Sequence, residues 1–160
     1  MEKIFRASEI VELGIQIEKN GRDLYDMLAN KSKNKKAEEV FKYLEGEETK
    51  HIAAFKKILE SVESYEPQSA YPEEYFAYMK ALASEYIFTK EGKGKAIAQR
   101  TKTDKKAVDL GIGFEKDSII FYEGMKRSVL KDEEKVLDEL IRQEEDHLRR
   151  LIDLKHDIVS

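Results

Sequence analysis

A chain of 160 residues with a formal net charge of −4 and no cysteine predicts one domain over residues 1–160, with a core of its own. The lack of cysteine excludes disulfides, thiolate zinc sites, iron–sulfur clusters and thiol nucleophiles, and the acidic balance opposes a nucleic-acid partner. Because no apolar run is long enough to span a bilayer and the first residues form no apolar signal core, we expect a cytoplasmic protein with no membrane partner.

Two long helices are predicted in the first half of the chain. Ser8 is a suitable N-cap for the first helix, in which apolar residues recur at helical spacing as far as Leu28. The polar stretch 30–34 predicts a turn, and a second helix is expected over residues 35–64. Because the turn is short, the two helices are expected to form an antiparallel hairpin over residues 8–64.

The connection to the second half is long and rich in aromatic side chains. Pro67 and Pro72 end the second helix, a shorter helix is expected over residues 73–88, and stretch 91–95 is interpreted as a flexible loop. We expect the aromatic side chains to pack over one end of the bundle or in a dimer interface. These side chains are Tyr65, Tyr71, Tyr75, Phe76, Tyr78 and Tyr86.

The second half predicts another helical hairpin, over residues 103–158. Thr103 is suited to cap a helix that runs to about residue 128, and Asp132 to cap the last helix, whose apolar stripe includes Val136. Two hairpins joined by a long crossover with an extra short helix predict an all-α fold, a four-helix bundle.

The apolar stripes of the two halves are interrupted by the same polar residues. Each half contains a glutamate followed, about thirty residues later, by Glu-x-x-His, and the second half repeats the first at a displacement of about 96 positions. The residues concerned are Glu18, Glu48 and His51 in the first half, and Glu115, Glu144 and His147 in the second.

This pattern indicates metal ligands. Glutamate and histidine three positions apart lie on one helix face, and here they lie where an amphipathic helix should be apolar. Buried carboxylates need a compensating cation, and four of them balance two divalent ions. Carboxylate and imidazole ligands suit iron or manganese, with zinc as a substitute. An isolated Glu-x-x-His is usually surface charge, but the apolar surroundings and the repeat both oppose that interpretation.

Four further residues share a face with the first glutamate of their half. Tyr25 and Tyr122 lie two helical turns after it, so each either hydrogen-bonds a ligand carboxylate or a bound oxygen species, or is an ordinary core aromatic. Gly21 and Ser118 lie one turn after it. Such small residues either leave a pocket for dioxygen or peroxide or permit close helix packing.

The motifs resemble those of the ferritin-like di-iron carboxylate proteins, and among these the rubrerythrin-related group, over about residues 8–158. The segments that carry the resemblance are Glu18 with Tyr25, Glu48-Thr-Lys-His51, Glu115 with Tyr122, and Glu144-Glu-Asp-His147. The resemblance implies a ferritin-like bundle that holds two iron ions. It further implies that Glu48 and Glu144 bridge the metals. Glu18 with His51, and Glu115 with His147, would then complete the two coordination shells.

The chain departs from its relatives in three places. The four-cysteine, rubredoxin-like domain of full-length rubrerythrin is absent, so electrons would come from a separate carrier protein. Ser118 occupies the place of a further carboxylate of rubrerythrin, and Thr49 that of the haem-binding methionine of bacterioferritin.

The resemblance implies an oxidoreductase that reduces peroxide or dioxygen, working as a homodimer or a higher homo-oligomer. The alternative is an iron-binding protein of ferritin type, with ferroxidase or storage activity. A third interpretation is a structural or regulatory protein whose metals only hold the bundle together.

Overall fold

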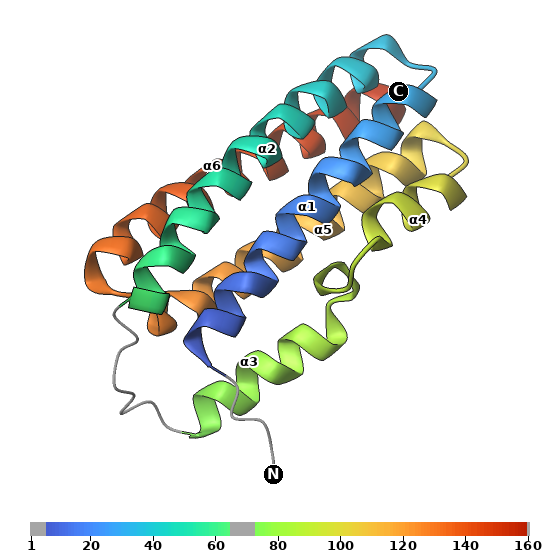
Figure 1. The fold of residues 1–160 in the computed structure, drawn as a ribbon. Coiled ribbons are helices and arrows are strands. Elements are labelled where there is room, and N and C mark those ends of the chain that lie inside the picture. Colours follow the sequence, from blue (N-terminus) through green and yellow to red (C-terminus); the bar gives the residue numbers. More distant parts are fainter. Residues whose placement is uncertain (1–5, 65–72, 160) are drawn as a thin grey trace.

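The computed structural model describes residues 6–64 and 73–159, which form a helical bundle (Figure 1). Its four long helices are α1 (Ala7–Lys31), α2 (Lys35–Ser64), α5 (Asp104–Met125) and α6 (Lys131–Val159). Helix α1 packs against α2, and α5 against α6, so each half of the chain forms an antiparallel hairpin. These described residues contain no strand, and none of their helices combines the length and apolar character needed to cross a membrane. The predicted four-helix bundle is therefore confirmed.

The crossover consists of α3 (Glu73–Glu85), the short 3-10 helix η1 (Ile87–Thr89) and α4 (Lys93–Arg100). It runs along one side of the bundle, with α3 against α5 and α4 against α1, rather than over one end (Figure 1). Tyr75 and Tyr86 are buried, whereas Tyr78 is 50% exposed. Four residues expected in or before this crossover lie outside the described residues: Tyr65, Pro67, Tyr71 and Pro72.

Helix α4 replaces much of the flexible loop expected over residues 91–95, because α1 supplies its partners. The buried Asn20 side chain donates from Nδ2 to the carbonyl oxygens of Phe88 and Lys90, at 2.6 and 2.8 Å. Its Oδ1 accepts from the backbone N–H of Gly94 at 3.0 Å. A Cβ at Gly94 would lie 2.0 Å from the carbonyl oxygen of Asn20, so only glycine allows α4 to approach α1 this closely.

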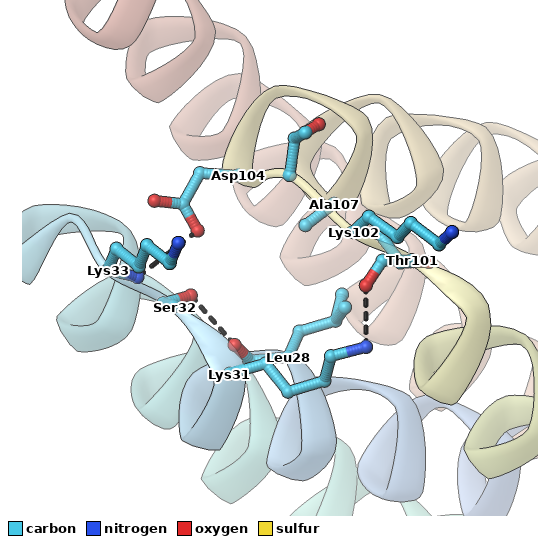
Figure 2. Close-up of a pocket in the computed structure, with 9 residues that line it drawn as sticks. Leu28, Lys31, Ser32, Lys33, Thr101, Lys102, Asp104 and Ala107 are labelled. Atoms are coloured by element: carbon cyan, nitrogen blue, oxygen red, sulfur yellow. Dashed lines mark hydrogen bonds between the residues drawn. The ribbon is translucent and has the colours of Figure 1, made fainter.

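The C-terminal end of α4 is held by Lys31, which lies at the end of α1. Its Nζ donates to the carbonyl oxygens of Ala98 and Gln99, both at 2.9 Å. Figure 2 shows the same amine reaching Thr101, beside a cavity at the junction of α1, α4 and α5. These bonds hold the last turn of α4, where helix carbonyl groups lack the usual intrahelical partners.

The helix ends differ from the prediction by two or three residues. Helix α3 ends at Glu85 instead of residue 88, and α5 ends at Met125 instead of about residue 128. Thr103 caps α5 as expected, since its Oγ1 accepts a backbone N–H at 3.2 Å. Ser8 lies inside α1 and Asp132 inside the first turn of α6, rather than at the cap positions. Val136 is 38% exposed, because the neighbouring Leu137 takes the core-facing position in this turn.

Candidate metal centre

The fold brings the six candidate ligands together in the middle of the bundle. Each of the four long helices contributes one glutamate, and α2 and α6 each add a histidine one turn later. The four glutamates are fully buried and the two histidines are 1% exposed. The residues are Glu18 on α1, Glu48 and His51 on α2, Glu115 on α5, and Glu144 and His147 on α6.

The six side chains form two overlapping groups that share Glu48 and Glu144. In each group, one nitrogen or oxygen atom from every member lies within 4.8 Å of the others. The first group is Glu18, Glu48, His51 and Glu144, and the second is Glu48, Glu115, Glu144 and His147.

The two imidazoles face carboxylates from other helices. Nδ1 of His51 lies 2.6 Å from Oε1 of Glu144 and 3.6 Å from Oε2 of Glu18. Nδ1 of His147 lies 3.4 Å from Oε1 of Glu48 and 3.6 Å from Oε1 of Glu115. The imidazole rings stack on each other, with centroids 5.5 Å apart.

The residues fit a pair of cations because their polar atoms lack other partners. Among the described residues, every buried side-chain oxygen or nitrogen without a hydrogen bond belongs to one of these six side chains. A buried carboxylate oxygen without a partner is strongly unfavourable, and bound cations remove that cost. The atoms are Oε2 of Glu18 and Glu115, both carboxylate oxygens of Glu48 and Glu144, and Nδ1 of His51 and His147.

The carboxylates also attract protons to the cluster. Burial by itself lowers the pKa of His51, but Glu18 and Glu144 outweigh it and raise that pKa to about 11. The pKa of His147 is likewise raised to about 11, against the effect of burial, chiefly by Glu115 and Glu144. Burial, together with the nearby Glu144, raises the pKa of Glu115 well above its usual value. Protons and metal ions therefore compete for the same atoms.

The two tyrosines hydrogen-bond candidate ligands, each from the opposite half of the chain. The hydroxyl of Tyr25 donates to Oε1 of Glu115 at 2.7 Å, and that of Tyr122 donates to Oε1 of Glu18 at 2.6 Å. Burial and the adjacent carboxylates raise the pKa of both phenols well above the usual value, so they stay protonated. Each phenol thus holds one carboxylate oxygen and leaves the other, Oε2, to face the cluster.

The small residues beside the glutamates serve packing. A Cβ at Gly21 would lie 2.6 Å from the ring of Phe114, so this ring fills the space. The hydroxyl of Ser118 is 2.9 Å from that of Tyr86, which also donates to the carbonyl oxygen of Phe114 at 2.9 Å. Of the two interpretations of Gly21, the structure favours close packing.

Two residues near the cluster were not assigned to it from the sequence. Tyr86 enters from the crossover, whose placement the helical pattern does not predict. Gln143 lies in α6, and its Oε1 is 2.7 Å from Nε2 of His51. The signal for Gln143 was present in the repeat, because it immediately precedes Glu144 as Glu47 precedes Glu48.

Comparison with known proteins agrees with this geometry. The family model described as Rubrerythrin matches residues 9–155. The structure is similar to the crystal structure of a Thermotoga maritima protein described as a ferritin-like diiron-carboxylate protein. The TM-score is 0.71, the sequence identity is 27%, and the match covers 98% of each chain. No curated protein matches the sequence. The ferritin-like fold expected from the sequence is thereby confirmed.

Proposed function

This chain belongs to the rubrerythrin family, and on that premise we propose that it is a di-iron oxidoreductase that reduces peroxide or dioxygen. When bound, two ferrous ions would supply the two electrons that reduce one peroxide to two waters, with two protons taken up. The six clustered glutamate and histidine residues would hold the ions, and a separate carrier protein would return the electrons.

The observation that carries this proposal is the set of buried ligand atoms that no group outside the cluster hydrogen-bonds. Eight such atoms converge from four helices, and all of them are types that bind iron. Two divalent ions would balance the four carboxylate charges inside the core. A structural role alone does not require this arrangement, because apolar residues would pack the same positions at lower cost.

The two overlapping ligand groups support a position for each residue relative to the two ions. Glu48 and Glu144 belong to both groups, which supports bridging positions between the two ions. Glu18 with His51, and Glu115 with His147, belong to one group each, which supports terminal positions. Tyr122 and Tyr25 hold Oε1 of Glu18 and Glu115, which would leave Oε2 of each glutamate to bind a metal ion.

A rapid-mixing experiment tests the reaction. Protein loaded with ferrous iron without oxygen is mixed with hydrogen peroxide or with dioxygen, while ferric absorption and oxidant consumption are recorded. We expect one peroxide to be consumed for about two ferrous ions, at a rate far above that of free ferrous iron. Glu144→Ala should abolish the fast phase, and Glu145→Ala, an exposed glutamate beside it, should retain it.

Two outcomes would contradict the proposal. A rate equal to that of free ferrous iron with both oxidants would remove the oxidoreductase function. Continued iron uptake in air, far beyond two ions per chain and in a large multisubunit shell, would favour ferritin-type storage instead.

A further inference from the structure

The outer nitrogen of His51 faces the amide oxygen of a glutamine, and this oxygen can only accept a hydrogen bond. Nε2 of His51 lies 2.7 Å from Oε1 of Gln143. The orientation of that amide is set at its other end, where Nε2 of Gln143 donates to Oε1 of Glu139 at 3.3 Å. Because an amide oxygen has no proton to give, Nε2 of His51 must be the donor.

This bond decides which nitrogen of His51 can bind a metal. With the proton of the neutral ring on Nε2, the lone pair of Nδ1 points toward the carboxylates of Glu18 and Glu144. A metal-binding imidazole needs this tautomer, and an acceptor on the other nitrogen both fixes the ring and raises its basicity. Gln143 therefore prepares His51 for a metal ion.

The other imidazole lacks this support. Position 47, which corresponds to Gln143 in the repeat, holds a glutamate whose carboxylate interacts with Tyr43 and lies 3.8 Å from the amine of Lys50. The ring of Tyr43 meets that of His147 edge to face, with centroids 6.2 Å apart. Within residues 6–64 and 73–159, no hydrogen bond of the kind made by Gln143 holds Nε2 of His147.

We propose that Gln143 is a positioning residue for His51 and that the two halves of the metal centre consequently fill unequally, the His51 half first. The inference rests on the proposed metal site, and it concerns the order and affinity of filling rather than the ligands themselves.

Cobalt(II) is a suitable probe because its visible absorption reports the ligand environment. Purified protein is freed of metal and titrated with cobalt(II) under argon, and absorption and heat are recorded together. We expect two resolved binding steps in the unmodified chain. Gln143→Leu should weaken the tighter step by about 10- to 100-fold, the usual cost of losing such a partner. Gln143→Glu keeps an acceptor and should restore the tighter step.

A matched control and a second measurement separate positioning from simple damage. Gln99→Leu, at an exposed position on α4, should leave both steps unchanged. In the zinc-loaded protein, nitrogen NMR of the histidine rings should show the Nε2–H tautomer for His51. That signal should change in Gln143→Leu while the helical circular dichroism stays the same.

The outcomes are distinguishable. Two equal steps in the unmodified chain, or identical titrations of Gln143→Leu and Gln99→Leu, would overturn the inference and leave the metal site standing. No cobalt binding by the unmodified chain would overturn both the inference and the proposed function.

Discussion

At the scale of single residues, the cluster shows what residue spacing can and cannot predict. The spacing places Tyr25 on the face of Glu18, and the expected hydrogen bond to a candidate ligand is present. Two helical turns span about 11 Å, however, so a tyrosine cannot reach the glutamate of its own helix and bonds the one on the facing helix instead. The sequence alone does not show which helix lies opposite each tyrosine. Gln143 was missed because helical spacing does not single out one half-buried amide, and the repeat marks only its position beside Glu144.

Removal of one phenol tests this crossed arrangement. Tyr122→Phe would leave Oε1 of the fully buried Glu18 without its hydrogen-bond donor. In the metal-free protein we expect the free energy of unfolding to fall by about 1–3 kcal/mol, the usual cost of an unpaired buried polar group. Urea denaturation measures the change. Tyr78→Phe, at a half-exposed position, should change stability by less than about 0.5 kcal/mol. Equal effects of the two variants would show that the bond to Glu18 contributes nothing.

At the scale of elements, local sequence patterns predict the four long helices well and the short helix α4 poorly. The apolar stripes and the cap at Thr103 are local. The structure confirms this cap, and the four long helices begin within about two residues of the predicted positions. Helix α4 has only eight residues and contains a glycine, so it has little intrinsic tendency to form. Its stability comes from Asn20 and Lys31, which are distant in sequence and hold its two ends. No pattern within residues 91–100 contains that information.

A pair of glycine substitutions tests how closely α4 packs against α1. Gly94→Ala would force a Cβ against the backbone of Asn20, so we expect a loss of about 1–3 kcal/mol in the free energy of unfolding. Gly113→Ala adds the same methyl group inside α5, where nothing lies within 4 Å, and should stabilise the protein by about 0.5–1 kcal/mol. Both changes can be measured by urea denaturation of the metal-free protein. A neutral Gly94→Ala would contradict the close contact between α4 and α1.

At the scale of the whole molecule, the bundle and its charged centre depend on each other. Four helices bury their apolar stripes against one another, and in doing so they enclose four carboxylates and two imidazoles. The overall architecture could be predicted because the same pattern occurs twice, with a long connection between the copies. The distances within the cluster could not, because they depend on the packing of all four helices at once.

The raised histidine pKa values give the metal-free molecule a defined pH dependence. The pKa is about 11 for His51 and His147 in the fold and about 6.5 in an unfolded chain. Because the folded values are higher, this stabilisation is complete below about pH 6.5 and is lost as the pH rises toward 11. We expect the metal-free protein to melt at a lower temperature at pH 9 than at pH 6.5. Bound metal replaces these protons, so the metal-induced rise in Tm should be larger at pH 9.

Scanning calorimetry at the two pH values measures both trends. A double variant in which His51 and His147 are replaced by glutamine should lose most of this pH dependence, which separates the cluster from surface groups. A metal-free protein whose Tm rises between pH 6.5 and pH 9 would contradict the sign derived from these two groups.

The most direct test of the metal centre is the iron content of protein loaded with ferrous iron without oxygen and then desalted. We expect about two ions per chain in the unmodified protein. In Glu48→Ala we expect less than about one, because Glu48 belongs to both ligand groups. Glu39→Ala, an exposed glutamate on the same helix, should retain about two. An unmodified protein that binds no iron, or a Glu48→Ala variant that binds as much as the unmodified chain, would contradict the assignment of this cluster as a di-iron centre.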